Sequence, residues 1–151
     1  MTNRKPFSSE EFKEIYSKVP RLCVDLVVKT PEGLVLSLRN LPSWRGKWHL
    51  PGGTVLCGER IVDTIKRVAQ EELGISVEIQ KMLGYIEFPS EKKERGFGHT
   101  VSMAFLCFAD KTGFKPNEES SKIEVFKDLP PNLIEEQHKF LESVWLEIEL
   151  S

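Results

Sequence analysis

Two adjacent glutamates, Glu71 and Glu72, lie near the end of the segment GERIVDTIKRVAQEELG. At about 100° per residue, a helix over 60–73 places one apolar arc on its buried side, formed by Ile61, Ile65, Val68 and Ala69. Glu72 falls inside this arc, and Glu71 lies at its edge. A carboxylate on a buried face is costly unless it is paired or binds a metal, and adjacent carboxylates repel each other. The pattern therefore indicates a cation site. The structural alternatives are that Glu72 reaches water past the last turn and that Arg67 and Glu71 form a simple ion pair.

Further oxygen ligands precede this helix. The glycine pair Gly52–Gly53 lets a backbone carbonyl approach a ligand closely, and Glu59 is a third carboxylate. A hard cation such as Mg²⁺ prefers oxygen ligands, keeps several waters and is usually shared with substrate phosphates. The residue types thus favour a Mg²⁺ site that acts on a phosphate-containing substrate.

The elements that must position these residues predict a mixed α/β (α+β) fold. Helical spacing is found over 8–19, 60–73 and 131–150. Strands are expected over 21–30, 34–39, 76–88, 99–109 and 122–130, with a short strand and a glycine turn over 49–59. The charged segment 89–98 is expected to be a mobile loop. Because the first two strands form a hairpin, the sheet should be mixed, with helices packed against it.

Length and composition predict one domain over 1–151, with a core of its own. The net charge of −2 gives no footprint for nucleic acid or for an anionic membrane surface. No apolar run approaches the roughly 18 residues of a spanning helix, and the first residues lack the apolar core of a signal peptide. The three cysteines form no metal-ligand pattern or disulfide framework, which favours the cytoplasm. A nucleophilic role for Cys57 is the less favoured reading.

The spacing of these residues forms a longer motif, made of Gly53, Glu59, Arg67, Glu71, Glu72, Gly74 and Ile75. It resembles the Nudix box of the MutT-like Nudix hydrolases, G-x5-E-x7-R-E-U-x-E-E-x-G-U, where U is aliphatic. The segment WHLPGG before it is also typical of that family. The sequence departs from the box at Val68, where the family has glutamate, and Ala69 is a weak match to the first aliphatic position.

The resemblance implies the Nudix fold, an α/β/α sandwich around a mixed sheet. It also implies hydrolysis, dependent on Mg²⁺ or Mn²⁺, of a nucleoside diphosphate linked to another moiety. Carried over by position, Glu71 and Glu72 would be metal ligands, and the Gly53 carbonyl a further one. Arg67 would orient the glutamates, and Glu59 would support the loop.

A second resemblance, over residues 8–75, is to the GDP-mannose mannosyl hydrolases, Nudix relatives that also have a degenerate box. It implies that Arg39 binds the diphosphate and that Glu119 is a further metal ligand. It favours an NDP-sugar such as GDP-mannose as the substrate. The alternatives are pyrophosphohydrolysis of ADP-ribose or of nucleoside triphosphates, and a nucleotide-binding domain with impaired catalysis.

The general base is missing from two expected positions. Val68 cannot accept a proton, and Ser120 stands where the mannosyl hydrolases have a histidine. The loop carboxylates Glu118 and Glu119 are alternative bases, unless they form a solvated turn. His99 is a less favoured candidate.

Other residues are assigned to substrate binding. Arg45 would grip phosphate together with Arg39, unless it is a solvent-facing loop cation. Segment 89–98 is a candidate lid, with Trp44 and Phe97 as stacking residues, whereas Trp48 is assigned to the core. The expected partner is a small-molecule nucleotide, and a homodimer is common among such proteins.

Overall fold

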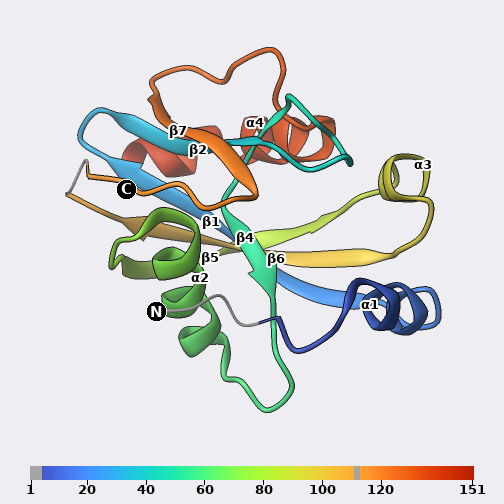
Figure 1. Cartoon of the computed structure of the whole chain (residues 1–151). Coiled ribbons are helices and arrows are strands. Elements are labelled where there is room, and N and C mark those ends of the chain that lie inside the picture. Colours follow the sequence, from blue (N-terminus) through green and yellow to red (C-terminus); the bar gives the residue numbers. More distant parts are fainter. Residues whose placement is uncertain (1–4, 111–112) are drawn as a thin grey trace.

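The computed structural model describes residues 5–110 and 113–151. Its helices are α1 (Ser9–Tyr16), α2 (Ile61–Leu73), α3 (Glu91–Arg95) and α4 (Glu135–Leu150). Its strands are β1 (Arg21–Thr30), β2 (Gly33–Arg39), β3 (Trp48–His49), β4 (Gly52–Thr54), β5 (Glu78–Glu87), β6 (Thr100–Phe108) and β7 (Ser120–Phe126). Figure 1 shows the strands running through the middle of the molecule with the helices around them.

The strands of the described residues form one seven-stranded mixed sheet. Its main order is β3-β2-β1-β6-β5, with β4 paired to β1 and β7 paired to β2. The β1–β2 hairpin is antiparallel, as expected, while β1 and β6 are parallel. The prediction of a mixed sheet is confirmed.

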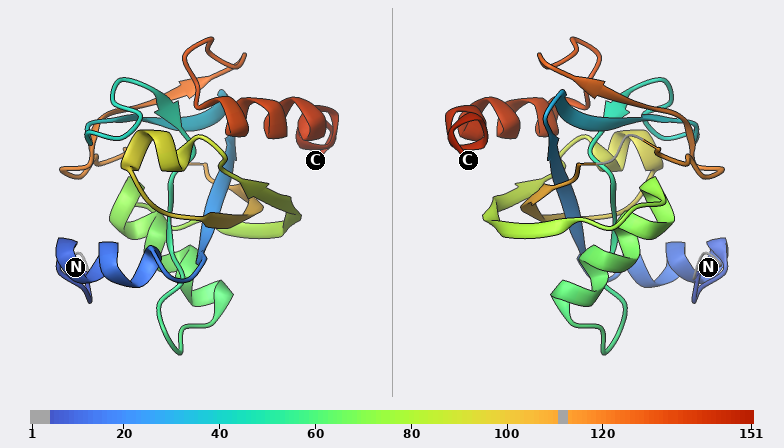
Figure 2. Two further views of the ribbon diagram at one scale, coloured as in Figure 1. Left: turned by 90° about the vertical axis from the view of Figure 1, so that its right-hand side faces the viewer. Right: turned by 90° about the vertical axis from the view of Figure 1, so that its left-hand side faces the viewer.

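Alternate residues of β1 face two separate cores. One core joins β1 to α2 and includes Val24, Leu26, Val28, Ile65, Val68, Ala69 and Leu73. The other joins the opposite face of the sheet to α4 and includes Val27, Leu36, Leu106, Leu141 and Ile148. Figure 2 shows α2 and α4 separated by the strands. The expected α/β/α sandwich is therefore confirmed, and a buried strand of this kind has apolar residues on both faces.

The apolar arc of α2 is buried at Ile65, Val68 and Ala69 and half-buried at Ile61, as its spacing predicts. The helix ends at Gly74, whose φ of 68° is the left-handed conformation that favours glycine. At the start of α1, Ser8 and Glu11 form the predicted capping box. These boundaries follow from local residue signals.

Two predicted elements differ in the structure. Segment 89–98 is not only a loop, because it contains α3, and the buried Glu91 ties it to β6. The last helix begins at Glu135, because Leu133 pairs with Trp48 in a short parallel bridge. In both cases a contact distant in sequence decides the local structure. Within 5–110 and 113–151, no helix is long and apolar enough to cross a membrane.

Candidate active site

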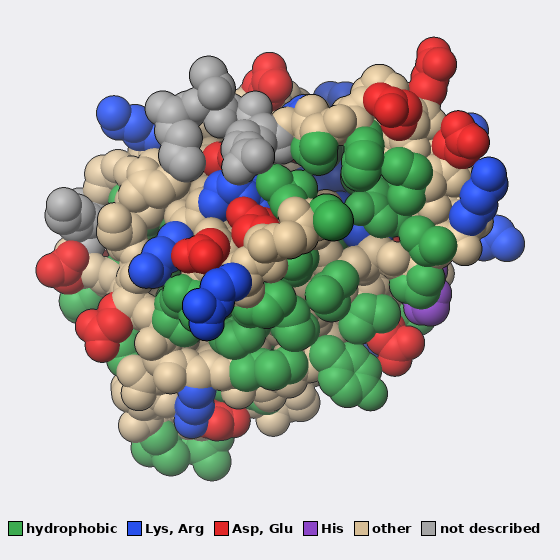
Figure 3. All heavy atoms as spheres, turned by 90° about the horizontal axis from the view of Figure 1, so that it is seen from below, with side chains coloured by type: hydrophobic (Ala, Val, Ile, Leu, Met, Phe, Trp, Pro, Cys, Tyr) green, Lys and Arg blue, Asp and Glu red, His purple; other side chains and the backbone are tan. Residues whose placement is uncertain are grey.

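A cleft of about 1160 Å³ opens beside β1, β4 and α2. It is lined by most of the residues assigned from the sequence, namely Arg39, Gly53, Arg67, Val68, Glu71, Glu72 and Glu119. The N-terminal helix α1 contributes Phe12 and Tyr16 to its rim. Figure 3 shows the molecule from below, a face where hydrophobic side chains lie among charged ones of both signs.

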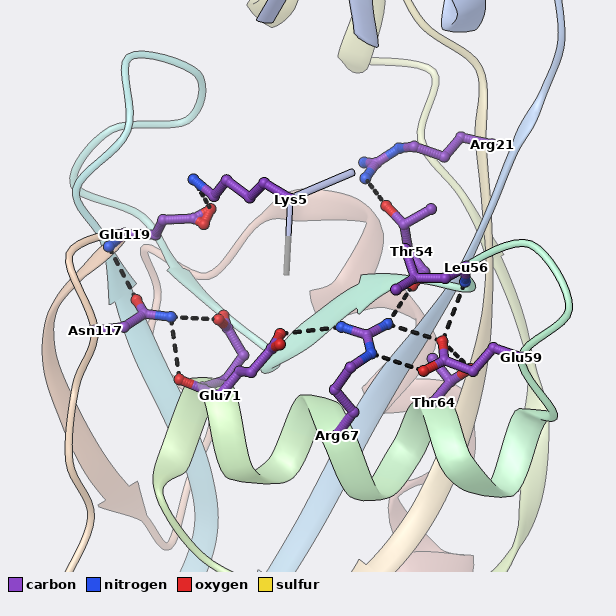
Figure 4. Close-up of polar contacts among 11 residues, drawn as sticks. Lys5, Arg21, Thr54, Leu56, Glu59, Thr64, Arg67, Glu71, Asn117 and Glu119 are labelled. Atoms are coloured by element: carbon purple, nitrogen blue, oxygen red, sulfur yellow. Dashed lines mark hydrogen bonds and ion pairs between the residues drawn. The ribbon is translucent and has the colours of Figure 1, made fainter. Parts of the chain in front are cut away.

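Arg67 is the centre of an ion-pair network on α2 (Figure 4). Its guanidinium donates to both carboxylate oxygens of Glu59 at 2.8 and 3.0 Å, to Glu71 at 3.0 Å and to the Thr54 carbonyl at 2.7 Å. The side chains of Arg67, Glu59 and Glu71 are only 10%, 13% and 11% exposed. The hydrogen bonds from Arg67 lower the pKa of Glu59 to about 2. Arg67 thereby joins β4, the start of α2 and Glu71.

Glu72 lies on the same face of α2 as the apolar arc, one turn after Val68, and lines the cleft. Burial raises the pKa of its carboxyl to about 7, and repulsion by Glu119 and Glu71 adds to this shift. Opposing the shift, the Asn117 amide donates a hydrogen bond to Glu72 at 2.5 Å. The carboxylate is thus desolvated and surrounded by excess negative charge, an arrangement that a bound cation would relieve.

Asn117 organises the loop that carries Glu119 (Figure 4). Its amide also donates to the Glu71 carbonyl at 3.2 Å, and its side-chain oxygen accepts from the Glu119 backbone N–H at 2.9 Å. Glu119 also approaches Lys5 at 3.9 Å. Sequence reasoning missed Asn117. The available signal was its place in the turn before the acidic pair, where asparagine often bonds its own backbone.

The two arginines assigned to phosphate binding differ in position. Arg39 lines the cleft, where its guanidinium is held by Ser43 through bonds of 2.7 and 2.8 Å. Burial and the nearby Arg95 lower the pKa of Arg39 to about 10. Arg45 is exposed, is not among the cleft residues and donates a hydrogen bond to the Asn40 side chain at 3.5 Å. The structure therefore does not bring Arg45 to the site.

Two glycines allow β4 to lie close to its neighbours. A side chain at Gly52 would collide with Asp25, and one at Gly53 would lie 3.0 Å from Val68. Val68 is 1% exposed and belongs to the core between β1 and α2. The residue that replaces the box glutamate is therefore a packed core side chain that also borders the cleft.

A buried polar group lies on the cleft side of the sheet, formed by Asp25, His49 and Gln137. The Gln137 amide donates to Asp25 at 3.3 Å, and its oxygen accepts from the Leu50 N–H at 2.9 Å. Burial raises the pKa of Asp25 to about 7 and lowers that of His49 to about 4. Sequence reasoning missed these residues. For Asp25 the signal was one acid within the apolar run LCVDLVV.

Asp25 should make the stability of the protein depend on pH. Its carboxyl is protonated in the folded protein below about pH 7 but ionises near 3.8 in the unfolded chain. The free energy of unfolding should therefore fall as the pH rises from about 4 to about 7, by on the order of 3–4 kcal/mol. In urea titrations Asp25→Asn should lose the Asp25 share of this fall and keep the share of Glu72, whose pKa is also raised to about 7, whereas the exposed Asp128→Asn should retain the full fall. A fall in Asp25→Asn as large as that of the wild type would contradict the assignment.

The remaining candidates lie as follows. Ser120 begins β7 and is buried, and within the described residues its hydroxyl makes no hydrogen bond. His99 is exposed and borders a separate, smaller pocket, and Glu118 does not line the cleft. Trp48 is a core residue, as expected. The other aromatic and sulfur candidates, Trp44, Phe97 and Cys57, line the cleft.

Comparisons with known proteins agree with this geometry. The family model described as NUDIX domain matches residues 19–144. The chain belongs to the Nudix family. It is 35% identical over 133 residues to the low-salt glycan biosynthesis protein Agl8 of Haloferax volcanii, covering 86% of this chain and 83% of that protein.

Two further relatives extend the comparison. The ADP-ribose pyrophosphatase of Methanocaldococcus jannaschii is 26% identical over 107 residues, which cover 71% of this chain and 62% of that protein. The structure of a MutT Nudix hydrolase from Burkholderia pseudomallei matches with a TM-score of 0.73 and 25% identity, covering 83% of this chain and 98% of that one. The chain is thus a Nudix hydrolase that acts on nucleoside diphosphate derivatives.

Nudix hydrolases generally use divalent metal ions, and the donor set of this cleft fits one. Within the described ranges, no three His, Cys, Asp or Glu side chains lie close enough together to hold a metal by themselves. However, the half-buried Glu72, with Glu119 and Glu71 nearby, provides oxygen donors in a region of excess negative charge. Mg²⁺ suits such a partial shell, because it keeps several waters and shares its coordination with substrate phosphates.

Proposed function

We propose that this Nudix protein hydrolyses an NDP-sugar, of which GDP-mannose is the first candidate, in the presence of Mg²⁺ or Mn²⁺. The observation that carries the proposal is the convergence of Glu72, Glu119 and Arg39 on one cleft. Carboxylates and a guanidinium that line the same cleft suit a metal-bound diphosphate. The name of the Haloferax relative, a glycan biosynthesis protein, supports a sugar as the linked moiety.

Each residue then has a distinct task. The carboxylates of Glu71, Glu72 and Glu119, with the Gly53 carbonyl, would hold the cation. When bound, that cation neutralises charge that develops on the diphosphate. Arg39 donates to phosphate oxygens with a guanidinium that Ser43 already holds in place.

Arg67 acts as a positioning residue, because it contacts Glu71 and the backbone of β4 rather than the expected site of the substrate. An oxygen of Glu119 can also accept the proton of the attacking water. Of the two loop carboxylates, only Glu119 lines the cleft. This role compensates for Val68 and Ser120, neither of which can act as a base.

A hydrolysis panel with Mg²⁺ or Mn²⁺ tests the function. The panel consists of GDP-mannose, UDP-glucose, ADP-ribose, diadenosine polyphosphates and nucleoside triphosphates, with free sugar, inorganic phosphate and NMP detected separately. We expect turnover of an NDP-sugar. Free sugar together with intact NDP would indicate attack at the sugar carbon, whereas NMP would indicate attack at phosphorus. The proposed substrate would be overturned if ADP-ribose, diadenosine polyphosphates and nucleoside triphosphates were all hydrolysed faster than GDP-mannose and UDP-glucose.

Two other functions have specific support. The Methanocaldococcus relative, named an ADP-ribose pyrophosphatase, favours ADP-ribose as a pyrophosphohydrolase substrate, and a nucleoside triphosphate stays a prediction. The packed core position of Val68 favours a Nudix domain that binds nucleotide with impaired catalysis. Nucleotide binding without any turnover in the panel would select this last function. A cytoplasmic location and a homodimer stay predictions.

A further inference from the structure

We propose that Arg21 and Arg95 form a second anion subsite in the cleft, which binds a carboxylate or phosphate that the substrate carries in addition to its diphosphate. The inference rests on the proposed function and narrows its substrate class. Both arginines line the cleft, but neither belongs to the Nudix box. Arg21 begins β1 and Arg95 ends α3, so the sheet and a distant helix bring them together.

One buried carboxylate lies beside the two guanidinium groups and pairs with that of Arg95. Glu91 is 2% exposed, and it accepts hydrogen bonds from the Thr100 N–H at 2.8 Å and from the Thr100 hydroxyl at 3.0 Å. Arg95 approaches Glu91 at 3.3 Å, but its buried Nε makes no hydrogen bond within the described residues. Within 5–110 and 113–151, the hydrogen bonds of Arg21 go to two hydroxyl groups, Thr100 at 3.3 Å and Thr54 at 2.8 Å. This cluster therefore carries one positive charge that has no carboxylate partner within the described residues.

Aromatic rings fix the orientation of both guanidinium groups. Arg21 lies 5.2 Å from the centre of the Phe12 ring, and Arg95 lies 5.7 Å from the same ring. Phe97 and Trp44 also pack near Arg95, at 5.9 and 6.0 Å. Stacking on rings holds a guanidinium plane while its N–H groups remain available in that plane. The Arg21–Arg95 pair is thus pre-organised for bidentate binding of an anion.

This subsite is coupled electrostatically to the carboxylate end of the cleft, because the charge of Glu119 opposes the lowering of the Arg95 pKa. Burial and the charge of Arg21 lower the pKa of Arg95, so the two cations destabilise each other in the absence of an anion. In Figure 4, Arg21 lies well apart from Glu119 and Asn117. Arg39 interacts electrostatically with both the arginine pair and the carboxylates, because Arg95 lowers the pKa of Arg39 while Glu119 and Glu72 raise it. A diphosphate held at Arg39 would therefore leave the Arg21–Arg95 pair for another anionic group.

Matched substrate pairs test the subsite. The first pair is UDP-glucuronate and UDP-glucose, which differ by a carboxylate on the sugar. The second pair is ADP-ribose 2′-phosphate and ADP-ribose, which differ by a phosphate on the nucleoside. Dissociation constants are measured by calorimetry in EDTA, where no metal supports hydrolysis. We expect the charged member of at least one pair to bind about tenfold more tightly. The pair that shows the preference identifies the source of the anion.

Three variants complete the test. Arg95→Gln and Arg21→Gln should each abolish the preference, while Lys93→Gln, an exposed cation on the same helix, should retain it. Arg21→Gln leaves Glu91 paired with Arg95, so it remains informative if Arg95→Gln fails to fold. Equal affinities in the wild type, or a preference that survives both arginine changes, would overturn the subsite. A preference without turnover in Mg²⁺ would instead retain the subsite and overturn only the proposed hydrolysis.

Discussion

Replacing Glu72 with glutamine is expected to lower kcat for hydrolysis at least about a thousandfold, because it removes the anionic oxygen that the cation needs. The fold should be unchanged, since a glutamine oxygen can still accept the hydrogen bond from Asn117. Steady-state rates over a range of Mg²⁺ concentrations, with circular dichroism as the check on folding, measure both effects. The exposed Glu78→Gln on β5 is the matched control and should keep full activity. Full activity of Glu72→Gln would overturn the metal-site assignment.

In metal-free buffer, Glu72→Gln should not lower the stability of the protein, although it lowers its activity. The pKa of Glu72 is raised to about 7, so the folded wild type holds this proton more tightly than the unfolded chain does. Wild-type stability should therefore fall as the pH rises from about 4.5 to about 7, and Glu72→Gln should lack this contribution. At pH 8 in EDTA the variant should be at least as stable as the wild type. Lower stability would mean that Glu72 is a structural carboxylate and not one reserved for a ligand.

Replacing Arg67 with glutamine is expected to lower the free energy of unfolding by about 3–5 kcal/mol. The change leaves Glu59 and Glu71 without the cation that contacts both, and it removes the bond to the Thr54 carbonyl. Arg67→Lys should restore only part of the free energy of unfolding lost in Arg67→Gln. One ammonium group cannot reproduce the guanidinium contacts to Glu59, Glu71 and the β4 backbone. Urea denaturation measures the loss, and activity should fall with it because Glu71 loses its orientation.

An exposed ion pair provides the control for Arg67. Lys139 and Glu135 lie 3.0 Å apart with side chains about three-quarters exposed, so Lys139→Gln should cost less than about 0.5 kcal/mol. Acid titration gives a second readout. Because Arg67 lowers the pKa of Glu59 to about 2, the pair stabilises the wild type above about pH 4.5, and this contribution is lost as the pH falls toward 2. Arg67→Gln should show a smaller loss of stability over that range. Equal acid sensitivity would show that Arg67 is not the main partner of Glu59.

Residue spacing alone was enough to predict the helix that carries Glu71 and Glu72, the mixed sheet and the Nudix assignment. These features depend on periodicity and on a motif within about 25 residues, where helix geometry fixes which side chains share a face. The end of α2 at Gly74 and the capping box of α1 belong to the same class, since they depend on local backbone geometry. Arg45 shows the limit of such reasoning, because a cation beside the motif in sequence lies outside the cleft in space.

Only the tertiary structure decided the rest of the site. Asp25 and Gln137 are 112 residues apart in the chain, yet they meet because β1 and α4 pack together. Arg21 and Arg95 lie near each other because α3 contacts β6. The expectation of a mobile loop over 89–98 did not include this contact. The sequence determined which residues can do chemistry and how α2 presents its carboxylates. The packing of distant elements determined which of those residues face one cleft, because burial and charge pairing depend on neighbours that no local pattern specifies.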